Sequence, residues 1–113
     1  MPKRARSSHV VVLVTCGSRG EAHMLARRVV TLSLAACVNV LESPANSVYR
    51  WKGKVRQSRE FLLMIKTSRR RLGALRAEVE RLHSYDLPEF IALPIVSGAP
   101  AYLRWLDDCL REA

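Results

Sequence analysis

The spacing of hydrophobic positions along the chain changes several times, and each change predicts a new element. Residues 9–15 (HVVVLVT) form a β-branched apolar run, which is typical of a strand, and the sequence CGSRG after it predicts a loop. From Glu21 onward the apolar period becomes that of a helix. The predicted inner face of this helix is Ala22, Leu25, Ala26, Val29 and Ser33.

Strand patterns return in the middle of the chain and predict a hairpin. Residues 36–42 (ACVNVLE) and 47–51 (SVYRW) are separated by a break at SPAN, and in the second run Tyr49 and Trp51 share one face. The sequence WKGKV predicts a tight turn, in which Gly53 supplies a positive φ. The return strand, 54–67, contains five consecutive apolar residues, 61–65.

The last part of the chain predicts a helix, a strand and a second helix. Ser68 is the expected N-cap of the first of these helices. Its apolar stripe is Leu72, Leu75, Val79 and Leu82. Residues 88–96 (PEFIALPIV) have strand character. The amphipathic helix over 99–113 turns inward the residues Ala99, Leu103, Leu106 and Leu110.

The predicted order is β-α-β-β-α-β followed by one more helix. Right-handed crossovers place both connecting helices on the same face of a four-stranded antiparallel sheet. The expected fold is therefore α+β, a ferredoxin-like βαββαβ sandwich with an extra C-terminal helix.

The strands are apolar on both faces, although the helices of such a fold cover only one. The runs VVVLV, FLLMI and FIALPIV do not alternate between apolar and polar residues. About six to eight large side chains would then face solvent, each contributing roughly 1.5–3 kcal/mol if buried, against a total stability of ~5–15 kcal/mol for a domain. We expect another copy of the chain to cover this face, which makes the protein an obligate homo-oligomer.

Composition sets further bounds. The 113 residues suit a single domain over 9–113 after a disordered basic arm at 1–8 (MPKRARSS), and the chain contains no apolar run of the ~20 residues that a membrane span requires. Three cysteines without a CxxC motif do not suggest a zinc knuckle, and free thiols indicate a cytoplasmic location. The net charge is +9, and residues 50–71 hold nine basic residues and one acid, so this stretch either attracts an anionic partner or is a solvated basic face.

Five blocks of the sequence together resemble the CutA divalent-cation-tolerance family. The blocks are LAACVNV, SVYRWKGKV, EFLLMIKT, LHSYDLPEFIALPI and AYLRWL, in the family's order from about Val10 to Leu110. The resemblance implies a tight homotrimer of ferredoxin-like protomers with a role in tolerance of copper and other divalent metals. It also implies an architecture similar to that of PII-type regulators, and no enzymatic activity.

The resemblance also implies a set of residues in clefts between subunits. These are Cys37, Trp51, Glu60, Lys66, His83, Tyr85, Glu89 and Trp105. The chain departs from the family where members commonly read His-Pro-Tyr, because Ser84 stands in place of the proline.

Two kinds of site follow from these residues. His83, with Cys16 at the end of the first strand, is the candidate ligand pair for copper or another divalent cation; the alternative is that His83 only completes the carbonyls at a helix C-terminus. Glu60 beside Lys66, with Tyr85 and Glu89 nearby and Trp51 as a wall, is the candidate pocket; it would bind a small anionic or zwitterionic ligand in a PII-like regulator, or be a buried ion pair.

Two other functions are not expected. Catalysis would need Cys37 and His83 as a pair, and the apolar surroundings of Cys37 do not favour a reactive thiolate. Nucleic-acid binding on the sheet would need exposed aromatic residues on the central strands, which FLLMIKT lacks. The expected partners are therefore other copies of the chain and a metal ion or small anionic ligand.

Overall fold

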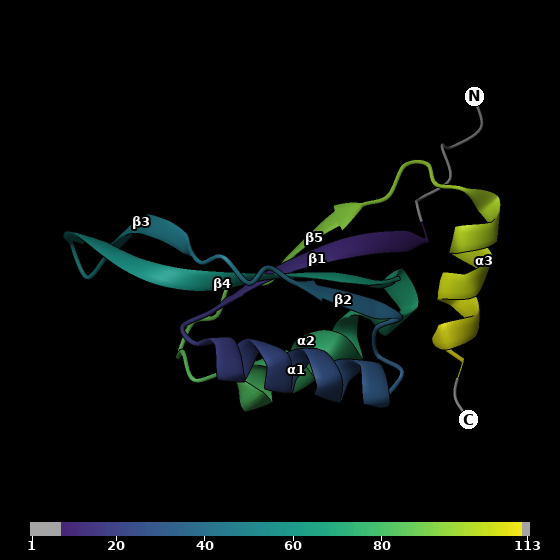
Figure 1. Cartoon of the computed structure of the whole chain (residues 1–113), viewed down its shortest axis with the longest axis horizontal. Helices are drawn as coiled ribbons and strands as arrows, with labels where there is room; N and C mark the ends of the chain where they lie inside the picture. Colours follow the sequence, from purple (N-terminus) through teal and green to yellow (C-terminus); the bar gives the residue numbers. More distant parts are fainter. Residues whose placement is uncertain (1–7, 112–113) are drawn as a thin grey trace.

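The computed structural model describes residues 8–111, and its elements follow the predicted order (Figure 1). Within this range it is a mixed α+β fold whose elements are β1 His9–Cys16, α1 Arg19–Thr31, β2 Cys37–Val40, β3 Ala45–Trp51, β4 Lys54–Ser68, the 3-10 turn η1 Arg69–Arg71, α2 Leu72–Leu82, β5 Ile91–Pro94 and α3 Pro100–Cys109. The predicted arm at 1–8 lies outside the described residues except for Ser8, whose carbonyl accepts a hydrogen bond from the Arg69 N–H. Among the described helices, none is long and apolar enough to cross a membrane.

The sheet is antiparallel throughout and is organised around the 15-residue strand β4. Its order is β2-β4-β1-β5, while β3 pairs with the N-terminal half of β4 beyond the end of β2. The turn between β3 and β4 consists of Lys52 and Gly53, both with positive φ (51° and 77°). This is the backbone that a two-residue hairpin requires, so the predicted turn is confirmed. Figure 1 shows the hairpin projecting beyond the helices at one end of the molecule.

Helices α1 and α2 lie against one face of the sheet and form the main core with it (Figure 1). Alternate residues of β1 are buried there, namely Val10, Val12, Val14 and Cys16. They pack with Leu25, Val29, Leu63, Ile65, Leu75 and Val79. The predicted apolar stripes of both helices are thus confirmed at the positions that reach this core.

The other face of the sheet is apolar and carries no helix (Figure 1). In register across the strands, Val11 lies opposite Leu93 and Leu13 lies opposite both Ile91 and Met64. Residues paired in this way project from the same face. Leu93 and Ile91 are 46% and 48% exposed. The prediction that large apolar side chains occupy the face opposite the helices is therefore confirmed.

Helix α3 packs at the end of the sheet away from the hairpin (Figure 1). Leu106 and Leu110 are buried against Ala36 in a second, smaller core. The Nε of Arg71 donates to the carbonyl of Leu110 at 3.2 Å, which satisfies a carbonyl at the end of the helix. Ala99 is exposed at the N-cap of α3, so its predicted inward position is wrong.

The element boundaries differ from the predicted ones in three places. Helix α1 begins at Arg19 and ends at Thr31, so Ser33 lies in the following turn with a φ of 58°. Ser68 precedes the 3-10 turn, but its hydroxyl makes no capping hydrogen bond and, within residues 8–111, is buried without a hydrogen-bond partner, so the predicted cap is wrong. Strand β5 has four residues rather than nine, because only Val10 to Leu13 of β1 pair with it.

One buried hydrogen bond ties β4 to the turn after α1, and it yields a stability prediction. The Thr67 hydroxyl, which is fully buried, donates to the Leu34 carbonyl at 2.7 Å. Thr67→Val keeps the shape of the side chain and leaves this carbonyl unpaired, so we expect a loss of about 1–3 kcal/mol in the free energy of unfolding. Urea unfolding at a single protein concentration measures it.

The matched control is Thr31→Val, the same change at an exposed position. It should alter stability by less than about 0.5 kcal/mol. Equal stability losses in the two variants would contradict a specific role for the Thr67 hydrogen bond.

Candidate functional site

Three side chains of metal-ligand type meet where β1 ends. Cys16 is the last residue of β1, Glu21 lies in the first turn of α1, and His83 follows the last residue of α2. One ligand atom from each lies within 4.8 Å of the others. The structure thus brings together Cys16 and His83, the pair proposed from the sequence, and adds Glu21.

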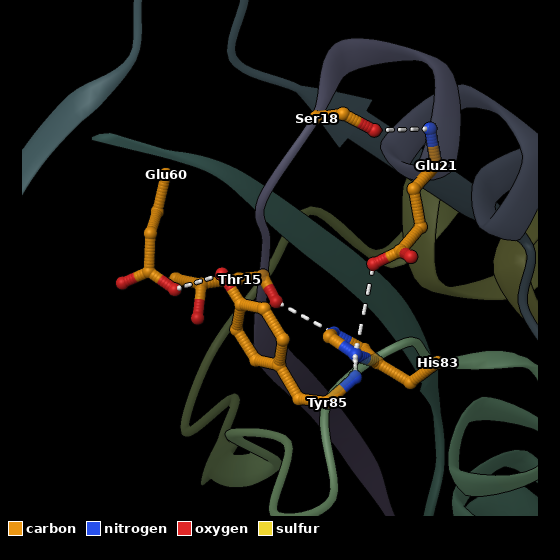
Figure 2. A network of polar contacts seen from close by, with 6 residues as sticks. All are labelled: Thr15, Ser18, Glu21, Glu60, His83 and Tyr85. Carbon is orange, nitrogen blue, oxygen red and sulfur yellow. Dashed lines mark hydrogen bonds and ion pairs between the residues drawn. The ribbon is translucent and has the colours of Figure 1, made fainter. Parts of the chain in front are cut away.

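His83 is held by hydrogen bonds to both ring nitrogens (Figure 2). Its Nε2 donates to the Thr15 carbonyl at 2.7 Å, and its Nδ1 accepts from the Tyr85 N–H at 3.0 Å. These partners define a neutral imidazole with its proton on Nε2. The side chain is fully buried. Its ring therefore contacts β1 and the loop that follows His83. The alternative, in which the ring completes the last carbonyls of α2, is not what the structure shows.

Glu21 is positioned by the cap of α1. Ser18 is the N-cap residue, and its Oγ accepts from the Glu21 N–H at 3.2 Å (Figure 2). The carboxylate points back toward His83, with Oε1 3.6 Å from Nδ1. Oε1 is buried and, among the described residues, has no hydrogen-bond partner. Since Nδ1 carries a lone pair rather than a proton, this approach leaves both atoms facing each other as acceptors.

The Cys16 thiol completes the cluster. It is fully buried, and burial raises its pKa to about 12, with a further contribution from the negative charge of Glu21. The thiol is therefore protonated at neutral pH.

The donor set fits a divalent transition metal. Thiolate, imidazole and carboxylate are ligands of zinc, and thiolate and imidazole also suit copper. Glu21 Oε1 and His83 Nδ1 are 3.6 Å apart, and neither atom carries a proton that could bridge them. A cation between two such acceptors would interact favourably with both. An ion bound by all three residues would require loss of the thiol proton and release of the Tyr85 N–H from Nδ1.

Tyr85 connects this cluster to a neighbouring cavity. Its backbone bonds His83, and its hydroxyl donates to Glu60 Oε2 at 3.0 Å (Figure 2). Burial raises the pKa of the Tyr85 phenol, and the hydrogen bond to Glu60 and the Glu60 charge raise it further. Gly17 allows this approach, because a Cβ at that position would lie 3.0 Å from the phenol oxygen.

The cavity has a volume of about 650 Å³ and lies between the β3–β4 hairpin and the loop after α2. Four of the residues proposed from the sequence line it, namely Trp51, Glu60, Tyr85 and Glu89. The residues that the sequence analysis did not single out include Tyr49 and Asp86. The alternation of strand 47–51 already placed Tyr49 beside Trp51, whereas Asp86 gave no signal.

Three other proposed residues lie at the opposite end of the sheet. Lys66 is six positions from Glu60 along β4, a distance of about 20 Å in a strand, and it donates to Asn39 Oδ1. Cys37 pairs with Lys66 in register, and Trp105 lies on α3 against Tyr102. Within one chain Lys66 therefore does not lie beside Glu60, and the pocket or ion pair that the resemblance implies between subunits stays a prediction. The positive charge expected for an anionic ligand is absent from the cavity lining that the structure describes.

Comparison with known proteins relates these features to a family. The family model described as CutA1 divalent ion tolerance protein matches residues 10–109. The divalent-cation tolerance protein CutA of Thermus thermophilus is 43% identical over 98 residues, which cover 87% of this chain and 94% of that protein. The crystal structure of CutA1 from Oryza sativa matches with a TM-score of 0.89 and 42% identity, over 96% of this chain and 98% of that one.

Some relatives are longer. The CutA homolog of Xenopus laevis is 44% identical over 99 residues, and the chloroplastic CutA of Arabidopsis thaliana is 45% identical over 103. The chain spans 65% of the first protein and 56% of the second. With the family model matched over nearly the whole sequence, the chain belongs to the CutA1 divalent ion tolerance family.

Proposed function

We propose that the protein is a homotrimer that binds a divalent metal ion, copper or another transition metal, through Cys16, Glu21 and His83. The observation that carries this proposal is the convergence of one ligand atom from each residue within 4.8 Å, together with a buried Glu21 oxygen that has no hydrogen-bond partner in the described part of the chain. The family name, divalent ion tolerance, supports the class of ligand. When bound, the ion would be the ligand that the protein senses or sequesters.

The proposed trimer rests on the uncovered face of the sheet. The strand order β2-β4-β1-β5 supports a ferredoxin-like βαββαβ unit, in which helices cover one face. Here the other face presents Val11, Leu13, Leu62, Met64, Ile91 and Leu93. Each of these side chains would contribute roughly 1.5–3 kcal/mol if fully buried. A second and third copy of the chain would bury them.

We propose a binding role rather than a catalytic one. Cys37 and His83 lie at opposite ends of the sheet, since Cys37 aligns with Lys66 and Val11 whereas His83 bonds Thr15. Cys16, the thiol that does lie beside His83, has a pKa far above neutrality and is a poor nucleophile. The aliphatic open face likewise offers no stacking surface for nucleic acid. The cytoplasmic location stays a prediction, supported by the three free cysteines.

Metal binding is tested by native mass spectrometry and calorimetry with Cu²⁺ and Zn²⁺. We expect one ion per chain. Glu21→Gln keeps the size of the side chain and removes its charge, and His83→Gln removes the imidazole; each should weaken binding by about tenfold or more, as loss of a ligand or its orienting partner does. Melting temperatures show whether each variant is folded.

The matched control is His23→Gln, an exposed histidine on α1 that bonds Glu42. It should leave the affinity unchanged. Binding that is insensitive to Glu21 and His83, or that is lost equally in the His23 variant, would refute this site.

The oligomer is tested by sedimentation velocity at nanomolar concentration. We expect a particle of three times the 12.8 kDa chain mass. Leu93→Glu places a charge on the open face and should dissociate it, because burial of an unpaired charge is far costlier than the apolar contact it replaces. Met24→Glu, at a similarly exposed position on α1, is the control and should stay assembled. A monomeric wild-type chain, or an assembled Leu93 variant, contradicts the proposal.

The state of the thiols offers a separate measurement. Because Cys16 is fully buried and its pKa is about 12, iodoacetamide at pH 8 should leave Cys16 unmodified in the native protein. All three cysteines should react after denaturation, as peptide mapping would show. Native alkylation of Cys16 as fast as that of the half-buried Cys37 or Cys109 would argue against an unreactive thiol.

A further inference from the structure

The cavity beside Tyr85 is built from aromatic and acidic side chains. Tyr49 and Trp51 project from the hairpin, Tyr85 from the loop after α2, and the carboxylates are Glu60, Asp86 and Glu89. Its volume of about 650 Å³ is that of a site for a small metabolite. Among the described residues, no lysine or arginine lines it.

The pairing of acidic side chains across the molecule sets this cavity apart. Residues 8–111 contain nine acids, and five of them form ion pairs or hydrogen bonds with arginine or histidine side chains, namely Glu42, Glu78, Glu80, Asp107 and Asp108. Glu21 approaches His83. The remaining three have no cationic partner within the described chain, and all three line the cavity. Although the chain has 19 lysines and arginines, the carboxylates of residues 8–111 that lack a cationic partner are thus gathered in one place.

Keeping these carboxylates ionised inside the cavity costs free energy, because they are partly removed from water and repel one another. Glu60 is only 9% exposed, and among residues 8–111 a single hydrogen bond reaches its carboxylate, from the Tyr85 hydroxyl. Burial raises the pKa of Glu89, and the charge of Glu60 raises it further. Two partly desolvated carboxylates that repel each other are stabilised by a positive charge placed between them.

The aromatic side chains indicate what kind of positive charge fits. The faces of tyrosine and tryptophan rings attract cations and also bury apolar groups, and this combination is typical of sites for amines and quaternary ammonium groups. A hydrated metal ion would gain little from three aromatic walls. Carboxylates on one side and rings on the other therefore favour an organic cation.

From this arrangement we propose that the cavity binds a small organic cation, an amine or a quaternary ammonium compound. Its charge lies beside Glu60 and Glu89, and its apolar part lies against Trp51 and the tyrosines. The site shares no proposed ligand residue with the Cys16, Glu21 and His83 cluster, although Tyr85 contacts both.

The experiment titrates the full-length protein with choline and follows the fluorescence of Trp51. The chain has two tryptophans, so in a Trp105→Phe background all of the tryptophan emission comes from Trp51. We expect saturable quenching by choline and none by 3,3-dimethylbutan-1-ol, which has the same shape without the charge. Glu60→Gln and Glu89→Gln should each weaken choline binding by about tenfold or more, because contacts to a charged group are lost.

The control variant is Glu80→Gln, which removes an exposed carboxylate on α2 that pairs with Arg76. It should leave the choline affinity within about twofold, as a surface ion pair contributes little. Melting curves establish that each variant is folded.

Four outcomes would overturn the inference. The first is absence of saturable quenching by choline up to millimolar concentration, and the second is equal binding of the uncharged alcohol. The third is equal quenching by Mg²⁺, which would assign the carboxylates to a bare ion. The fourth is tighter binding of 3,3-dimethylbutanoate that is lost in Lys66→Ala, which would mean that Lys66 of a neighbouring copy makes the cavity a site for anions.

Discussion

The antiparallel register of β1 and β4 is the constraint on which the rest of the structure depends. Eight consecutive pairs, from His9 opposite Ser68 to Cys16 opposite Phe61, join the two central strands. A slip of one residue would exchange the two faces of a strand, turning Val12 and Val14 away from the helices and Val11 and Leu13 toward them. The same register places Thr15 and Cys16 at the end of β1 closest to Glu60. It therefore positions both the Cys16, Glu21 and His83 cluster and the cavity.

The cluster and the cavity share one connecting residue. Tyr85 donates a hydrogen bond to His83 through its backbone N–H and to Glu60 through its hydroxyl. The centroid of its ring lies 4.7 Å from the centroid of the His83 imidazole, and the two rings are tilted. A ligand that takes the lone pair of His83 Nδ1 competes with the Tyr85 N–H, and a cation beside Glu60 competes with the Tyr85 hydroxyl. Occupancy of either site therefore acts on the same short segment, and a coupling between two sites of this kind is reciprocal.

Much of this arrangement could be predicted from the sequence, and the failures have physical causes. The order of elements and the Lys52–Gly53 turn follow from local periodicity and backbone preference, and Cys16 and His83 meet because a strand end and a helix end adjoin in this topology. Glu21 was missed because an acidic residue in the first turn of a helix is ordinarily explained by its favourable interaction with the helix dipole. Nothing in the sequence indicated a second role for it. Lys66 entered the predicted pocket through the family resemblance, which implies a cleft between subunits, and within one chain six residues of strand separate it from Glu60 by about 20 Å.

An acidic cavity in a chain of net charge +9 shows that net charge does not set the field of a site. The basic residues of the hairpin are exposed to solvent, where ions screen their effect beyond about 10 Å at 0.1 M salt. Glu60 is buried, so its charge acts through protein rather than water and is felt more strongly by its neighbours. A ligand approaching from a distance meets a positive protein, but a ligand inside the cavity meets carboxylates and aromatic rings. The nearest groups therefore decide which ligand is retained, and here they favour a cation.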